Sequence, residues 1–134
     1  MVDIPHSIFA NCVTLKEIQL PSTLKTIGMY AFNGCTALES LTIPDGTTTI
    51  GNACFAQCTS LATLSIPSSL VGAGSALGGP AFEDCGIESI EFRGNWTEIP
   101  SSMFTGVDSL KTIILPSTLK KINMYAFDDC DGLE

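Results

Sequence analysis

Hydrophobic residues recur along this chain in one fixed order. Within one unit, the apolar and proline positions follow phenylalanine at regular steps: Phe32, Cys35, Leu38, Leu41, Ile43 and Pro44. The phenylalanine that marks each unit recurs at Phe9, Phe32, Phe55, Phe82, Phe104 and Phe127. The spacing is 23 residues, except for 27 after Phe55 and 22 after Phe82. Self-similarity at a fixed period indicates a repeat architecture.

The end of each unit has the alternating pattern of a short strand. In the first unit, Glu17 and Gln19 alternate with the apolar Ile18 and Leu20, so the polar side chains are expected to face outward. Pro21 has no amide hydrogen to donate, and it is expected to end this strand. A second short extended segment is predicted at residues 24–27.

The remaining part of each unit predicts helical turns. Residues 28–35 carry apolar side chains three to four positions apart, which indicates one or two turns of helix ending near Gly34. One unit is too small to bury its own apolar face, but stacked units bury each other's faces. The sequence therefore predicts an α/β solenoid of about five repeats, with short parallel strands and short helical turns.

The repeated motifs F-x-x-C, L-x-x-I-x-L-P and L-x-x-I-x-x-x-A-F resemble the BspA-like leucine-rich repeat family. The resemblance extends from Ile4 to Leu133. It implies a right-handed solenoid of the kind found on extracellular proteins of gut and oral bacteria and some parasitic protists, which are associated with adhesion and host contact. Three positions depart from the motif, namely Thr47 in a leucine slot, Arg93 in the proline slot and Val107 in the cysteine slot. The third unit also contains a glycine-rich insertion.

Chain length and net charge limit the domain organisation and the classes of binding partner. The 134 residues suffice for a single repeat domain over 1–134, which begins and ends within a unit and is expected to be a piece of a longer array. A net charge of −8, without a basic patch, argues against nucleic acid and anionic membrane surfaces as partners. No apolar run is long enough to span a membrane. The resemblance implies a secreted or cell-surface location.

The cysteines are interpreted as core residues. Five of them share one repeat slot, and Val107, which can neither ligate a metal nor form a disulfide, fills that slot in the fifth unit. Cys54 takes a slot that elsewhere holds alanine. Free cysteine behaves as a small hydrophobic residue, so a reduced, buried column is favoured over disulfides, and disulfides over a metal site.

Other candidate sites carry weaker signals. The glycine-rich segment 72–80 resembles a dinucleotide-binding loop but lacks the long helix that such a loop requires. A loop that bulges from the solenoid is therefore favoured, and it is a possible contact point. His6 is expected to be exposed and not catalytic. The acidic residues 128–134 lack the pattern of a calcium loop, and the sequon at Asn95 is interpreted as a chance match. No enzyme activity, cofactor or metal is expected.

Outward strand residues form the most plausible binding surface. We call this surface the strand face, and it comprises Glu17, Gln19, Ser40, Thr42, Thr63, Ser65, Ser89, Glu91, Thr112 and Ile114. The first hypothesis is an adhesion module that uses this face to contact a protein or glycan. The second is a structural spacer that presents another domain and has no ligand of its own. A patch that departs from the repeat average would favour binding, and a uniform Ser/Thr face would favour a spacer. The open ends predict end-to-end pairing of copies or continuation into further repeats.

Overall fold

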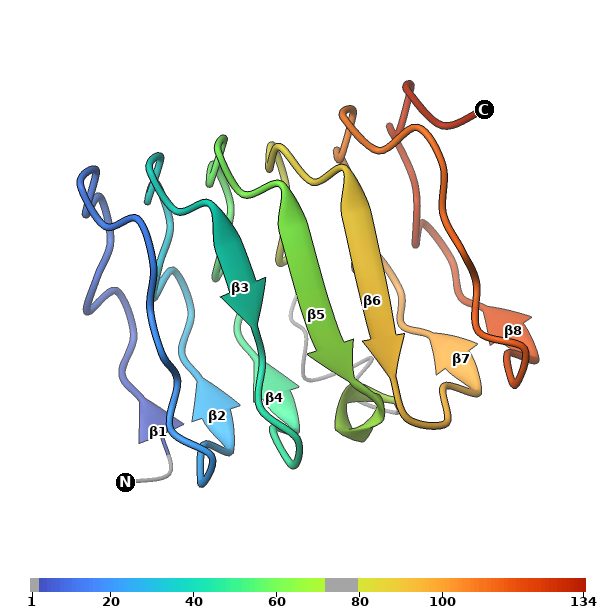
Figure 1. Cartoon of the computed structure of the whole chain (residues 1–134), viewed down its shortest axis with the longest axis horizontal. Coiled ribbons are helices and arrows are strands. Elements are labelled where there is room, and N and C mark those ends of the chain that lie inside the picture. The colour runs from blue at the N-terminus through green and yellow to red at the C-terminus, as the bar shows by residue number, and fades with distance from the viewer. Residues whose placement is uncertain (1–2, 72–79) are drawn as a thin grey trace.

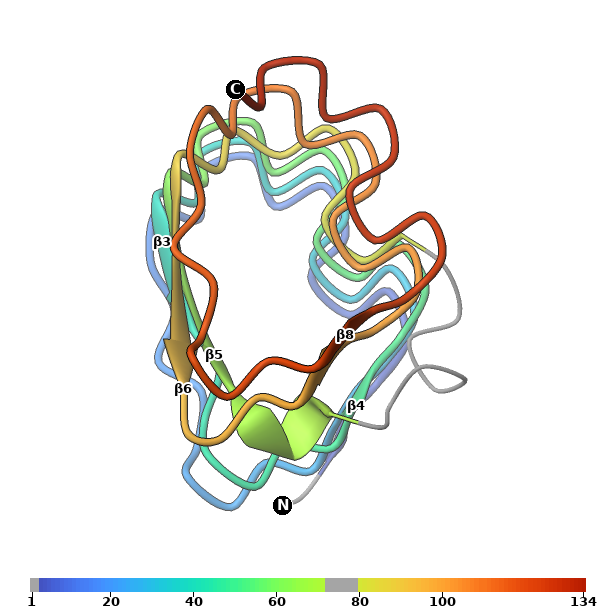
Figure 2. The ribbon, with the colours of Figure 1, turned by 90° about the vertical axis from the view of Figure 1, so that its right-hand side faces the viewer.

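The fold is a stack of similar turns. In the computed structural model, which describes residues 3–71 and 80–134, successive turns lie side by side along the long axis, with the two termini at opposite ends (Figure 1). Seen along that axis, each turn runs once around a common interior (Figure 2). The solenoid expected from the repeats is therefore confirmed.

Although no strand is assigned to residues 15–20, where one was expected before Pro21, or to residues 110–115, the alternating segments of the second, third and fourth units form one parallel sheet. It contains β3 (Ser40–Thr42), β5 (Thr63–Pro67) and β6 (Ser89–Arg93) in that order. The register aligns equivalent repeat positions, so Leu41 pairs with Leu64, and Leu64 pairs with Ile90. The 23-residue period thus places the same side chain of each unit in one column across the sheet.

The second extended segments form two further parallel sheets. The first contains β1 (Asp3–Ile4), β2 (Thr26–Ile27) and β4 (Thr49–Ile50), and the second contains β7 (Glu98–Ile99) and β8 (Lys121–Ile122). Between β4 and β7 comes the long third unit, in which a 3-10 helix, η1 (Ser68–Leu70), follows β5 directly. The glycine-rich insertion lies almost wholly outside the described residues.

The helical turns expected over residues 28–35 and their equivalents are absent. The described residues contain no α-helix, and this part of each unit is a series of tight turns. Positive φ angles recur within it, for example at Tyr30 (56°), Gly34 (72°) and Gln57 (62°), and such angles cannot occur inside a right-handed helix. The amide of Phe32 donates to the carbonyl of Cys54 in the next unit at 2.8 Å, and Phe55 donates to Ala81 at 2.9 Å. Hydrogen bonds between units therefore replace those within a helix.

The core is built from columns of identical residues. The marker phenylalanines stack ring on ring through the interior, with centroids 5.1 to 5.9 Å apart along the column from Phe9 to Phe127. Leucines and isoleucines from both extended segments complete the core. Close packing also limits side-chain size, because a Cβ atom added to Gly51 would lie 2.4 Å from the amide nitrogen of Met29.

The units on either side of the insertion carry unusual core residues. In the fourth unit, Phe92 and Trp96 fill slots that hold smaller side chains elsewhere, and their rings pack edge to face at 5.2 Å. Thr47, the departure in the second unit, is buried and donates from Oγ1 to the carbonyl of Leu24 at 3.2 Å. Thr47 is thus accommodated by a hydrogen bond to the preceding unit, whereas the buried Nε1 of Trp96 has no hydrogen-bond partner among the described residues. Among the described residues, no helix has the length and apolar character that crossing a membrane requires.

Candidate functional site: a hollow on the strand face

The strand face is solvent-accessible. Every residue assigned to it from the sequence is exposed except Ser65, which is half-buried. Because β3, β5 and β6 are in register, six of these residues form two rows across the sheet. The rows are Ser40, Thr63, Ser89 and Thr42, Ser65, Glu91. The face is therefore continuous over the middle of the solenoid.

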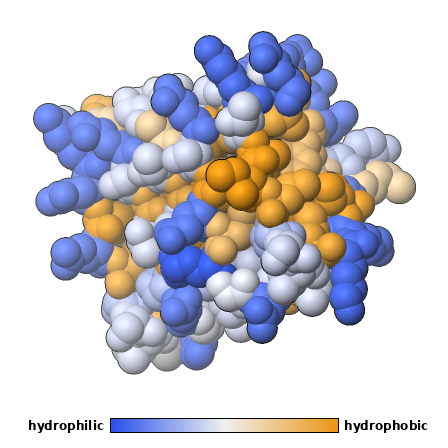
Figure 3. All heavy atoms as spheres, turned by 45° about the vertical axis from the view of Figure 1, so that its right-hand side comes forward, coloured by the Kyte–Doolittle hydropathy of each residue, from blue (hydrophilic) through white to orange (hydrophobic). Residues whose placement is uncertain are grey.

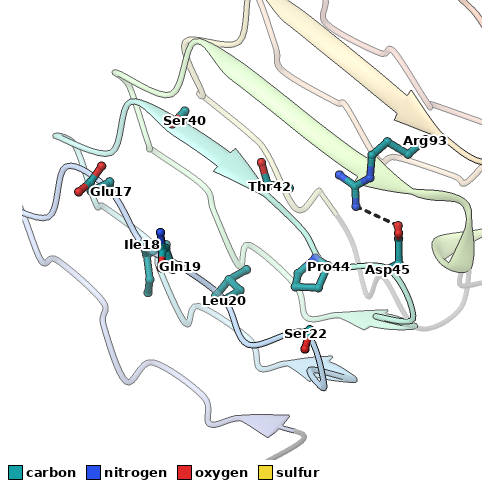
Figure 4. A pocket seen from close by; sticks show the side chains of 10 residues that line it. All are labelled: Glu17, Ile18, Gln19, Leu20, Ser22, Ser40, Thr42, Pro44, Asp45 and Arg93. Atoms are coloured by element: carbon teal, nitrogen blue, oxygen red, sulfur yellow. Dashed lines mark hydrogen bonds and ion pairs between the residues drawn. The ribbon is translucent and has the colours of Figure 1, made fainter.

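Two hollows lie on this face. The larger, about 780 Å³, spans the first two units and is closed at one end by Arg93 (Figure 4). We call it the Arg93 hollow. It is lined by Glu17, Ile18, Gln19, Leu20, Ser22, Ser40, Thr42, Pro44, Asp45 and Arg93. A smaller hollow of about 240 Å³ lies over β3, β5 and β6 and shares Ser40 and Thr42 with it.

The structure divides the predicted face into two parts. Eight of its residues, from Glu17 to Glu91, line one or both hollows. Thr112 and Ile114 line neither of these two, and no strand is assigned to their segment. The side chain of Ile114 is also apolar and 88% exposed, unlike the polar side chains of the other units. These two hollows therefore lie over the first four units.

Arg93 fixes the closed end of the larger hollow. It lies at the end of β6, paired with Pro67 of β5, in the slot that other units fill with proline. Its guanidinium reaches back towards the second unit, where Nη2 donates to the carbonyl of Ile43 and lies 3.1 Å from Oδ1 of Asp45. Nη1 donates to Oγ of Ser65 at 2.5 Å. One side chain therefore ties together three units of the repeat.

Ser65 links this cluster to the neighbouring carboxylate. Its hydroxyl accepts from Arg93 and donates to Oε2 of Glu91 at 2.6 Å. Glu91 is thereby held over β6, beside the smaller hollow. The result is a hydrogen-bonded chain of alternating charge that runs from Asp45 through Arg93 and Ser65 to Glu91.

The sequence did not identify Arg93 or Asp45 as site residues. The sequence did contain one clue, namely that Arg93 occupies the slot that other units fill with proline. Proline has no side-chain hydrogen-bond donor, whereas the guanidinium of arginine has five N–H donors in a planar fork. Asp45 and Ser22 sit in the turns just after Pro44 and Pro21, so they do not belong to the alternating strand pattern. Nothing in that pattern indicates that these turns border the hollow.

The cysteine column lies in the core, away from the strand face. All six cysteines are free, and all are buried except Cys12, which is half-buried. In four units the thiol donates to the carbonyl of the marker phenylalanine of the preceding unit, as from Cys58 to Phe32 at 3.3 Å and from Cys85 to Phe55 at 2.9 Å. Burial raises the pKa of the Cys54 thiol well above its ordinary value. The interpretation of these residues as a core column is confirmed.

The described residues place no functional site at the other candidates that the sequence suggested. His6 is exposed, as expected, and Trp96 is buried in the core beside an exposed Asn95. Across residues 3–71 and 80–134, no three His, Cys, Asp or Glu side chains gather as metal ligands. Of the possible contact point at residues 72–80, residues 72–79 lie outside the described residues.

Solved structures with the same fold come from bacterial leucine-rich repeat proteins. A protein from Bacteroides ovatus is 29% identical with a TM-score of 0.66, over 99% of this chain and 40% of that one. The leucine-rich repeat protein of T. pallidum is 30% identical with a TM-score of 0.58, over 98% of this chain and 50% of that one. A leucine-rich cell surface protein of Faecalibacterium prausnitzii shares the fold at 24% identity and a TM-score of 0.60, over 99% of this chain and 50% of that one.

The chain thus spans only 40–50% of the length of these structural relatives. No curated protein matches it. The family model described as "BspA type Leucine rich repeat region" matches residues 2–134 in six copies. Together with the stacked turns and the repeated core columns, this match establishes that the chain belongs to the BspA-type leucine-rich repeat family.

Proposed function

We propose that this chain is a non-enzymatic binding module that uses the hollowed part of its strand face to hold a protein or glycan outside the cell. The observation that carries the proposal is the Arg93 cluster. A spacer needs only a uniform face, whereas this face is interrupted by a charged side chain tied to Ser65, Ile43 and Asp45 across three units. Departure from the repeat average on one face is what distinguishes a binding surface from structural filler.

The polar groups of the hollow support the same proposal. Arg93 and Asp45 are paired with each other, whereas Glu17, Gln19 and Thr42 are exposed along the hollow (Figure 4). Leu20 and Pro44 add apolar surface between them. A concave surface with apolar patches and a few convergent polar groups is the usual form of a ligand site. The secreted or surface location and the role in adhesion are what the family resemblance implies.

The test is to fill the hollow without disturbing the core. Ser40 and Thr42 are exposed, so Ser40→Tyr and Thr42→Tyr place a bulky ring in the hollow and leave the packing of β3 intact. Binding to a glycan array and to immobilised extracellular-matrix proteins is then compared with that of the unmodified chain. We expect both variants to lose the ligand that the unmodified chain retains.

The matched control is Thr112→Tyr. Thr112 holds the position in the fifth unit that Ser40 holds in the second, so the variant adds the same ring to the strand face outside both hollows. It should bind as the unmodified chain does. If the unmodified chain binds nothing on either surface, or if Thr42→Tyr and Ser40→Tyr bind normally, the spacer hypothesis is the correct one.

A further inference from the structure

We propose that the Arg93 hollow binds an acidic saccharide, and that a carboxylate of this ligand takes the place of Asp45 on the guanidinium of Arg93. This inference rests on the proposed function and specifies the ligand of the same site. Arg93 and Asp45, the two partners of the ion pair, are held unequally by their surroundings.

Arg93 is held firmly by uncharged partners. Its side chain is 24% exposed, and it donates to the hydroxyl of Ser65 and the backbone carbonyl of Ile43. These two contacts keep the guanidinium at the end of the hollow whether or not a carboxylate is present. A guanidinium that is already oriented loses little side-chain entropy when a ligand binds, and its planar fork matches a carboxylate.

Asp45, in contrast, is held loosely. Its side chain is 86% exposed, and within residues 3–71 and 80–134 its one ion pair is the 3.1 Å contact with Arg93. Ion pairs between exposed groups contribute little to stability, because water solvates both charges well and salt screens them. The carboxylate of Asp45 therefore marks the position of a ligand carboxylate, and its displacement into water costs little.

The rest of the hollow suits a sugar better than an acidic peptide. Besides Arg93 and the carboxylates of Asp45 and Glu17, its polar groups are the hydroxyls of Ser22, Ser40 and Thr42 and the amide of Gln19. These small donors and acceptors match ring hydroxyls, while Leu20 offers an apolar surface for the C–H groups of a sugar ring.

The experiment uses fluorescently labelled oligogalacturonate and, as its neutral counterpart, the same oligomer with its carboxyl groups methyl-esterified. The two share linkage, stereochemistry and length, and they differ only in that the carboxylates of one are neutral methyl esters in the other. We expect oligogalacturonate to bind at least about tenfold more tightly than the neutral oligomer, and to lose this advantage in the Arg93→Gln variant. Binding should also weaken as ionic strength rises.

The direction in which Asp45→Asn changes the affinity for oligogalacturonate tests whether a ligand carboxylate replaces that of Asp45. It removes the competing carboxylate at an exposed position, so the fold is retained and affinity for oligogalacturonate should rise about two- to fivefold. A ligand that needs the negative charge of Asp45 would instead bind more weakly to this variant. Glu83→Gln makes the same change of charge outside both hollows, and it serves as the control for diffuse charge effects.

Several results overturn the inference while leaving the proposed function intact. These are equal binding of the acidic and neutral oligomers, a loss of affinity in Asp45→Asn, an equal gain in Glu83→Gln, and preference for an Asp-Ser-Asp-Ser peptide over oligogalacturonate. Absence of any oligogalacturonate binding also overturns it. The proposed function is then decided separately by the tyrosine variants of Ser40 and Thr42 on their own ligands.

Discussion

The ring of Phe32 lies flat on the ring of Phe55, with centroids 5.1 Å apart and planes only 3° from parallel. The two side chains occupy the same position in successive units, and both are fully buried. Each marker phenylalanine therefore packs mainly on its own copies in the neighbouring units. Because the contact is between units rather than within one, the stability of a unit depends on its neighbours.

Replacement of Phe55 by alanine is expected to destabilise the solenoid strongly. The ring has partners on both sides, Phe32 at 5.1 Å and Phe82 at 5.5 Å, so its removal leaves a cavity in the middle of the column. Large-to-small substitutions of this kind cost about 3–5 kcal/mol. Urea denaturation followed by circular dichroism measures the change. Phe127→Ala, at the half-buried end of the column, should cost less, and equal losses at the two positions would contradict the stacking account.

Replacement of Cys58 by valine is expected to be mild. Valine already occupies the equivalent slot at Val107, where it is fully buried, and the thiol of Cys58 contributes only a weak hydrogen bond to Phe32. Swaps that conserve volume in a core usually cost less than about 1.5 kcal/mol. Cys58→Asp is the contrasting variant, because it buries a carboxylate and should prevent folding. A Cys58→Val protein that fails to fold would show that the slot needs sulfur rather than volume.

Alkaline pH is expected to weaken the fold through its buried thiols. Burial, with a smaller contribution from charge on Cys58, raises the pKa of Cys35 from 9.0 to about 11. The folded state thus holds this proton more tightly than the unfolded state, so the stabilisation is fully present below pH 9 and is lost as pH rises towards 11. Denaturant titrations across this range should show a falling free energy of unfolding. The decline should be shallower in Cys35→Val, and an identical pH dependence in both proteins would contradict the assignment.

The C-terminal turn is expected to associate with a second copy of the chain. Figure 3 shows a broad hydrophobic area on the side of the molecule that includes this turn. The exposed apolar residues of this region include Ile114, Ile122 and Met124, and Met124 is 68% exposed. Apolar patches of this kind favour contacts with other proteins. Light scattering at increasing concentration should detect dimers, and the double variant Ile122→Lys and Met124→Glu should remain monomeric. Tyr30→Lys, in the second turn from the N-terminal end of the stack, provides a control that should not change the mass.

Much of the core followed from the sequence alone. A residue that recurs every 23 positions must return to the same place in each turn, so the phenylalanine column and the alternation of Ile18 with Gln19 could be predicted without coordinates. Val107 in the cysteine slot correctly indicated that the slot requires a small buried side chain. These predictions succeeded because burial depends on periodicity, which is a one-dimensional property of the chain.

The tight turns in place of helices, and the Arg93 hollow, were decided only by the tertiary structure. Apolar spacing of three to four residues is compatible with a helix, but the amide of Phe32 is satisfied by Cys54 of the next unit, a partner that exists only once the units stack. Likewise Arg93 and Asp45 are 48 residues apart in sequence, and no repeat position relates them. A contact between unlike slots in different turns depends on side-chain reach across the sheet, and the repeat pattern carries no information about it.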